Sequence, residues 1–201
     1  MSFIIVVGEF ACKDNTLPKS YPTVAAAIDN AAWMTGLERN SDIVILACYA
    51  PLLGNVNDPA GTTDAIYYNG VVAYETPIWW VFNLFGNHQG DTYIPSDSDA
   101  NDGREHEKIF HVASLDTNRN VLILKIVNTW DEDILIDTVQ LDGVDSIQGS
   151  NLTILTGGKW DMNDVDNPKR IAPTKAGFAM EGNSFSFNAP AFSLSVFDFQ
   201  L

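Results

Sequence analysis

The chain has 201 residues, enough for one large domain or two small ones, and its 46% hydrophobic and 18% charged residues are typical of a folded globular protein. Asp and Glu number 26 against 11 Lys and Arg, which gives a formal net charge of −15. Because nucleic acids and anionic membranes are polyanions, this charge argues against both as partners and suits an uncharged substrate.

No apolar run approaches the ~20 residues that a membrane span requires. The first residues lack a basic region and a small-residue cleavage site, so we identify no signal peptide in this chain. The two cysteines, Cys12 and Cys48, allow one disulfide at most. Both lie in apolar, strand-like surroundings where free buried cysteine is common, so pairing is the less favoured of two open alternatives.

The first third of the chain alternates strand and helix patterns. Residues 3–7, FIIVV, are apolar without interruption, which is typical of a strand buried on both faces. After a polar loop, Thr23 can serve as the N-cap of a helix whose apolar residues recur at spacings of three and four. A second apolar strand, residues 43–48, follows. Two strands joined by a helix predict a βαβ unit with a right-handed crossover.

Another amphipathic segment begins at Thr76-Pro77 and runs to Phe85. From about Gly86 the pattern changes to short strands between Asp, Asn and Gly turns, several of which alternate apolar and polar residues. We expect strands at residues 109–113, 121–128, 134–141, 152–156, 184–187 and 193–199. This pattern is typical of an antiparallel sandwich. The sequence therefore predicts an α/β portion, residues 1–85, followed by an all-β domain, residues 86–201.

Glu9 is the first candidate for chemistry. It follows the first apolar strand after Gly8, and the carboxyl end of a parallel strand is where α/β barrels and doubly wound sheets place catalytic groups. Burying an unpaired carboxylate is unfavourable, so the position needs a reason. Either a catalytic role or a structural ion pair with a neighbouring Arg or Lys would explain it, and the spacing alone leaves both open.

Three polar clusters resemble metal sites without matching them. His106 and His111 lie five residues apart, whereas a zinc-binding helix places them four apart. Segment 97–103 has its Gly one residue late for a calcium loop, and Lys108 stands where the bidentate Glu should be. The cluster 161–166 has an apolar residue at a ligand position. We therefore predict solvated acidic loops and no metal.

Several stretches closely resemble the α-L-arabinofuranosidases of glycoside hydrolase family 51, especially the fungal and plant type. The end of the catalytic barrel in that family is similar to VVGEFACKDN, PTVAAAIDNAAWMTGLERNSDIVILACYAPLLGNVND and YETPIWWVFNLFGNHQGD. Its C-terminal β-sandwich is similar, more loosely, to DNPKRIAPT and FNAPAFSLSVFDF. The resemblance implies an α/β plus all-β fold: the last two β/α units of a (β/α)8 TIM barrel, then an antiparallel, jelly-roll-like β-sandwich.

The resemblance also implies a reaction. It places Glu9 on the family's nucleophile, in a retaining mechanism in which a second, protonated carboxyl group donates to the leaving oxygen. The implied substrate is a terminal arabinofuranosyl unit on a plant cell-wall polysaccharide, such as arabinan or the hemicellulose arabinoxylan, or on an arabino-oligosaccharide. No metal or cofactor is implied. Members of the family can be oligomers, and we expect a full-length parent to be extracellular.

The chain departs from the family where it begins. The family's acid/base Glu stands in an Asn-Glu pair on barrel strand four, whereas this chain contains no Asn-Glu dipeptide and starts at what resembles strand seven. We therefore expect a C-terminal fragment that is inactive alone. Residues 3–7 would then lack the neighbours that bury such a strand, leaving an open apolar sheet edge.

The alternative to an enzyme fragment is a non-catalytic carbohydrate-binding or structural β-sandwich module. Trp130 and Trp160 could stack on sugar rings, although burial in the core is the favoured alternative for both. Asn151-Leu152-Thr153 is the one acceptor sequence for N-glycosylation, so Asn151 could carry a glycan in a secreted protein and otherwise marks the start of a strand.

Overall fold

The computed structural model describes residues 3–12, 21–57, 63–98, 108–178, 180 and 182–201. None of the helices in these ranges is both long and apolar enough to cross a membrane. The elements in chain order are β1 (Ile5–Phe10), α1 (Val24–Arg39), β2 (Val44–Tyr49), β3 (Leu53–Asn55), β4 (Ile66–Tyr68), β5 (Ala73–Glu75), α2 (Pro77–Asn87), β6 (Thr92–Ile94), β7 (Ile109–Asp116), β8 (Val121–Asn128), β9 (Ile134–Gln140), β10 (Gly149–Thr156), β11 (Thr174–Ala176), β12 (Ser184–Ala189) and β13 (Ser193–Gln200).

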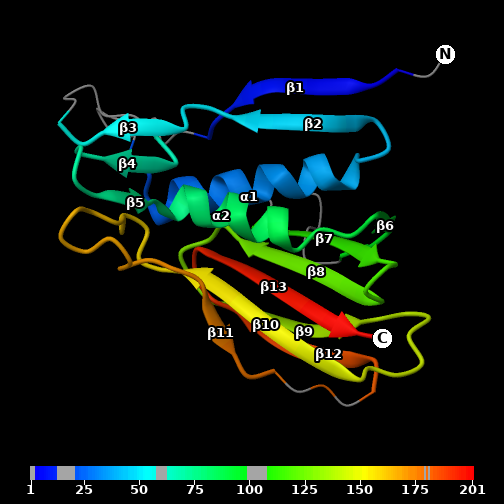
Figure 1. The fold of residues 1–201 in the computed structure, drawn as a ribbon. Helices are drawn as coiled ribbons and strands as arrows, with labels where there is room; N and C mark the ends of the chain where they lie inside the picture. Colours follow the sequence, from blue (N-terminus) through cyan, green and yellow to red (C-terminus); the bar gives the residue numbers. More distant parts are fainter. Residues whose placement is uncertain (1–2, 13–20, 58–62, 99–107, 179, 181) are drawn as a thin grey trace.

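The N-terminal part contains the predicted parallel pair. β1 pairs with β2 in parallel, and α1 makes the crossover between them (Figure 1). The Oγ1 atom of Thr23 accepts a hydrogen bond from the Ala26 amide at 3.3 Å, which confirms Thr23 as the N-cap of α1. Thr76 caps α2 in the same way, with Pro77 in the first turn. The small sheet β3–β4–β5 lies between β2 and α2 in the sequence.

The C-terminal part is a β-sandwich. Six antiparallel strands form one sheet in the order β11-β10-β13-β8-β7-β6, and β9 pairs with β12 in a second sheet. Alternate residues of β8 face opposite sides. Leu122, Leu124 and Ile126 pack with the β9–β12 pair, whereas Ile123 and Val127 share a core with the two helices. The large sheet therefore lies between the helices on one face and the β9–β12 sheet on the other (Figure 1).

The structure confirms the six strands expected in this part, within a few residues at their ends. It also contains β3, β4, β5, β6 and β11, of three residues each, which the sequence patterns did not indicate. The boundary at residue 86 stays a prediction. The core formed by α1, α2 and the large sheet includes residues from both sides of it.

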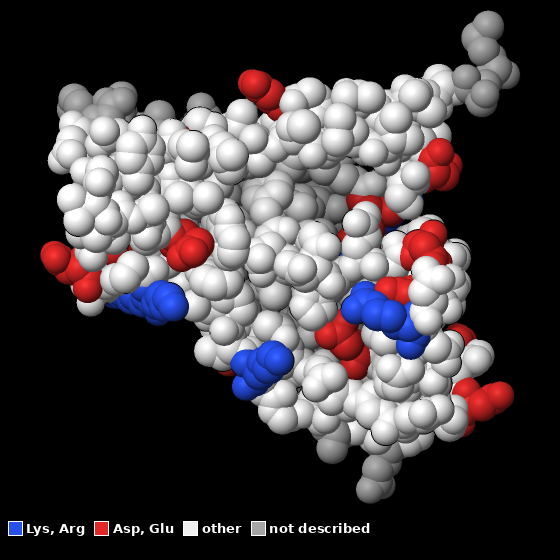
Figure 2. All heavy atoms as spheres, viewed as in Figure 1, with Lys and Arg blue, Asp and Glu red and all other residues white. Residues whose placement is uncertain are grey.

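The prediction that residues 3–7 form a strand buried on both faces is wrong for this chain. Phe3 is 65% exposed and Val6 is 54% exposed, and Leu46 on β2 is 51% exposed. The reason is that β1 pairs with β2 alone among the described strands, so little of the chain covers it. Figure 2 shows that the surface over β1 and β2 carries few charged side chains. This part therefore presents an apolar sheet to solvent.

Candidate functional site

Glu9 is the second-last residue of β1, at the carboxyl end of the parallel pair, as predicted. Its side chain is exposed, so the expectation of a buried carboxylate at this position is wrong for this chain. Within the described part of the chain it makes no hydrogen bond or ion pair, and the structural ion pair with Arg or Lys is not formed there. The carboxylate is thus free to meet a molecule from solvent, at the end of the pair where both helices begin.

Three aromatic rings support the strand beside Glu9. Phe10 of β1 meets Tyr49 of β2 edge-on, with 6.1 Å between ring centroids. Phe82 of α2 lies 5.8 Å from Phe10 and 4.8 Å from Tyr49. Such aromatic contacts bury large areas in preferred geometries. They hold the carboxyl ends of β1 and β2 against α2, which fixes the backbone that carries Glu9.

Asn30 fixes the chain just after Glu9. This side chain is fully buried in α1 and donates to the Ala26 carbonyl at 2.7 Å. Its Oδ1 accepts a hydrogen bond from the backbone amide of Cys12 at 3.1 Å. Burial, helped by the charge of Asp29, raises the pKa of the Cys12 thiol to about 11. Cys12 and Cys48 are both free, and Cys48 is exposed rather than buried.

Tyr49 makes this end of the molecule sensitive to alkaline pH. Its hydroxyl donates to the Thr63 carbonyl, and burial raises the pKa of Tyr49 to about 12, with the charge of Asp64 acting in the same direction. In the unfolded chain the phenol ionises near pH 10. The folded state therefore binds the extra proton between about pH 10 and 12, and this part of the stability is lost as pH rises through that window.

We expect Tyr49→Phe to reduce that alkaline loss. The variant loses one hydrogen bond at every pH below 10, so its urea midpoint at pH 8 should fall by the equivalent of about 1 kcal/mol. Between pH 8 and pH 11, however, its midpoint should fall less than that of the wild type. Tyr68→Phe, at an exposed tyrosine, is the control and should keep the wild-type loss. An alkaline loss in Tyr49→Phe as large as in the wild type would refute this origin.

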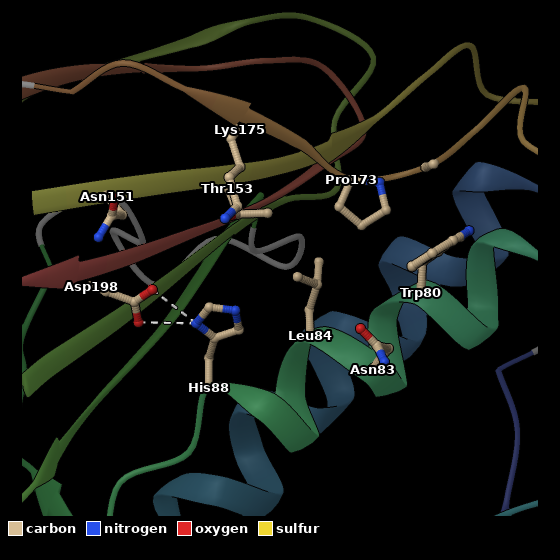
Figure 3. Close-up of a pocket in the computed structure, with 10 residues that line it drawn as sticks. Trp80, Asn83, Leu84, His88, Asn151, Thr153, Pro173, Lys175 and Asp198 are labelled. Carbon is tan, nitrogen blue, oxygen red and sulfur yellow. Dashed lines mark hydrogen bonds and ion pairs between the residues drawn. The ribbon is translucent and has the colours of Figure 1, made fainter. Parts of the chain in front are cut away.

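A second candidate site lies between α2 and the large sheet of the sandwich. It is a cavity of about 360 Å³ into which His88, Asn151, Lys175 and Asp198 turn polar groups (Figure 3). His88 Nδ1 lies 3.0 Å from each carboxylate oxygen of Asp198. Trp80 forms an apolar wall. The cavity could hold a small polar molecule. However, His88 and Asp198 already pair with each other, so neither group is available for acid–base chemistry on a ligand.

Asn151 lies inside β10 rather than at its start, opposite Asp198 in the pairing with β13. It is exposed, and its attachment of a glycan stays a prediction. Neither the sequence pattern nor the resemblance indicated His88 and Asp198 as a pair. They are 110 residues apart, and only the packing of α2 on the sheet brings them together.

The clusters that resembled metal sites are only partly described. His106 and most of segment 97–103 lie outside the described residues. Among the residues that the structure does describe, no group of three or more His, Cys, Asp and Glu could hold a metal ion. Asp161, in the third cluster, accepts from the Gly158 amide at 3.0 Å and pairs with Arg170 at 2.7 Å. The Asp161 carboxylate therefore stabilises the loop in which it lies.

The favoured prediction for the two tryptophans, burial in the core, is wrong. Trp130 is 38% exposed and Trp160 is 48% exposed. Both lie in loops between strands, where there is no hydrophobic periodicity from which to predict whether a side chain is buried or exposed. Each has a lysine over it: Lys108 Nζ lies 3.9 Å from the Trp130 ring centroid, and Lys159 Nζ lies 4.7 Å from that of Trp160.

The family model and the curated relatives of this chain are α-L-arabinofuranosidases. The family model described as "Alpha-L-arabinofuranosidase C-terminal domain" matches residues 8–193. Alpha-L-arabinofuranosidase 2 of Arabidopsis thaliana is 32% identical over an alignment of 195 residues that covers 96% of this chain. Alpha-L-arabinofuranosidase A of Aspergillus niger is 28% identical over 88% of it.

Solved structures show the same fold. An arabinose-bound α-L-arabinofuranosidase of glycoside hydrolase family 51 superposes on 98% of this chain with a TM-score of 0.88 and 32% identity. The Thermotoga maritima α-L-arabinofuranosidase, solved as an arabinose complex, covers 98% of this chain with a TM-score of 0.81. Its sequence identity is 21%, so this likeness is one of fold. This chain spans 28% of the Arabidopsis relative, 32% of the first structure and 43% of the second.

Proposed function

Since the chain belongs to the α-L-arabinofuranosidase C-terminal domain family, we propose that it is the C-terminal part of a retaining enzyme that removes terminal α-L-arabinofuranosyl units. Glu9 is the proposed nucleophile. The observation that carries this role is its place: an exposed carboxylate at the carboxyl end of a parallel strand, with no neutralising partner in the described part of the chain.

We further propose that β1, α1, β2 and α2 are the last two β/α units of a TIM barrel. The parallel pairing of β1 with β2 and the helix after each strand support this. So does the exposed apolar surface of the pair, because barrel strands are covered by neighbouring strands and an outer layer of helices. In a closed barrel, further strands would cover the two edges that this pair leaves free.

Retaining hydrolysis needs two carboxyl groups about 5 Å apart, one to attack the anomeric carbon and one to protonate the leaving oxygen. Glu9 can supply the first, and the second would come from a preceding part of the enzyme. The substrate we propose is arabinan, arabinoxylan or their oligosaccharides, which carry few charges and suit a protein of net charge −15. Because such polymers lie in the plant cell wall, we propose that the full-length enzyme is extracellular.

A chimera tests the proposal. This chain would replace the matching 28% of the Arabidopsis relative, and the release of 4-nitrophenol from 4-nitrophenyl α-L-arabinofuranoside would be measured. We expect turnover by the chimera and none by the 201-residue chain alone, since one carboxylate cannot both attack and protonate. Turnover by the chain alone would contradict the division of the site between two segments. A folded chimera without activity would contradict the proposed function.

A further inference from the structure

A shallow apolar pocket lies where the sandwich meets the start of α1. Tyr21, Thr23, Trp160 and Met162 line it, with a volume of about 300 Å³, and we call these four residues the Trp160 platform. Trp160 is 48% exposed, and Tyr21 and Met162 are each 36% exposed. Folding normally removes such large apolar side chains from water, so three of them around one pocket point to a contact with another molecule.

The platform lies on the same end of the molecule as Glu9. Lys159 and Asp161, on either side of Trp160, accept backbone hydrogen bonds from the first turn of α1: Ala25 to Lys159 at 3.1 Å and Val24 to Asp161 at 2.8 Å. In a βαβ unit the helix begins at the carboxyl end of the preceding strand. Figure 1 shows this arrangement: the arrowheads of β1 and β2, the starts of both helices and the loop between β10 and β11 share one end.

The loop that carries Trp160 is held firmly. Asn163, which is 3% exposed, donates to the carbonyls of Glu75 at 2.8 Å and Ile171 at 2.9 Å, and accepts from the Ile171 amide at 2.7 Å. A Cβ at Gly157 would lie 2.7 Å from Cδ1 of Ile171, so the loop packs closely there. Trp160 is thus exposed on a rigid support, which lowers the entropy lost on binding a ligand.

The charges around the platform favour an uncharged ligand. Asp161 is paired with Arg170, and Lys159 lies over the Trp160 ring and within 6.0 Å of the Phe192 ring centroid. The pocket lining itself contains only aromatic, thioether and hydroxyl side chains. Such a surface complements the C–H face of a sugar ring, while the ammonium of Lys159 can donate to sugar hydroxyls. A polyanion would meet a net charge of −15.

We propose that the Trp160 platform is a subsite that stacks one sugar ring of a neutral oligosaccharide, away from the unit that Glu9 would attack. The sandwich would then take part in substrate binding as well as in supporting the helices. The choice of an arabinan chain as ligand rests on the proposed function. The stacking does not, because it depends only on the exposed indole and its surroundings.

Isothermal titration of the 201-residue chain with linear arabinohexaose tests the platform. We expect measurable binding that Trp160→Ala weakens about tenfold or more, since loss of an aromatic stack and its buried area amounts to about 1.4 kcal/mol or more. Trp160→Phe should retain most of the affinity. Trp33→Ala is the matched control, because Trp33 is 53% exposed on α1 and does not line the pocket. Circular dichroism would confirm that each variant is folded.

Absence of binding by the wild-type chain, or equal affinity in Trp160→Ala and Trp33→Ala, would overturn the proposal. So would protection of Trp160 from acrylamide quenching in the chimera together with loss of arabinohexaose binding, because another polypeptide segment would then occupy the platform. An inactive chimera that still binds through Trp160 would contradict the proposed function alone. If the chimera is active and Trp160→Ala changes neither its affinity nor its KM for the hexaose, the proposed subsite alone would be contradicted.

Discussion

Replacing Glu9 with Gln is expected to lower kcat for an aryl α-L-arabinofuranoside in the chimera by at least about 10⁴-fold. An amide of the same shape cannot form the covalent bond to the anomeric carbon, so the first step of retaining hydrolysis is lost while substrate binding is largely kept. The loss should be as large with a dinitrophenyl leaving group, which departs without protonation. Loss of an acid/base residue would instead spare the first step with that substrate.

Two controls separate a nucleophile from a structural carboxylate. Glu132→Gln changes an exposed Glu in the sandwich and should leave kcat unchanged. Glu9→Ala with added azide should regain turnover and release arabinofuranosyl azide of inverted configuration, because the small anion can attack from the space that the side chain vacated. Activity of Glu9→Gln within tenfold of the wild type would exclude Glu9 as the nucleophile.

Lys125→Ala is expected to destabilise the chain by about 3–5 kcal/mol, measured as the free energy of unfolding in urea. Lys125 is fully buried on β8, and its Nζ lies 2.9 and 2.8 Å from the two carboxylate oxygens of Glu38 at the end of α1. Ser114 donates to the same carboxylate at 3.0 Å. Burial lowers the pKa of Lys125, and the Glu38 charge opposes the shift. Removing the Lys125 ammonium leaves the Glu38 carboxylate, which is nearly buried, without a counter-charge.

The size of the loss distinguishes a broken pair from lost packing. Lys125→Met keeps most of the side-chain volume and should still be strongly destabilising, because it also isolates the Glu38 carboxylate. The double variant Lys125→Met with Glu38→Gln removes both charges and should recover a large part of the loss. A loss below about 1 kcal/mol in Lys125→Ala would mean that water or another group replaces the ammonium.

The Lys125–Glu38 ion pair also shows what sequence patterns can and cannot predict. The strand VLILKIVN, residues 121–128, could be predicted to its last residue because its apolar run is long and bounded by turn residues. Its single Lys was a signal of a buried charge, but the partner lies 87 residues away on a helix. Periodicity reports which residues face inward along one element. It does not report which elements meet.

The candidate site follows the same division. Glu9 could be found because it stands at the end of an apolar strand, which is a local feature. Asn30 and Tyr49 were missed as supports because their contacts, to Cys12 and Thr63, depend on how α1 and the end of β2 pack. The exposure of β1 and of Trp160 depends on which other segments pack over them, and the local sequence pattern carries no information about those segments. Strands of three residues, such as β11, are too short to show alternation.

The role of Glu9 is tested most directly by trapping the covalent intermediate. The chimera would be treated with a slow-turnover arabinofuranosyl donor that carries a good leaving group, digested, and its peptides weighed by mass spectrometry. We expect one added arabinofuranosyl mass on the peptide that contains Glu9, and none in Glu9→Gln. An adduct on any other carboxylate, or full turnover without an adduct, would contradict Glu9 as the nucleophile of a retaining enzyme.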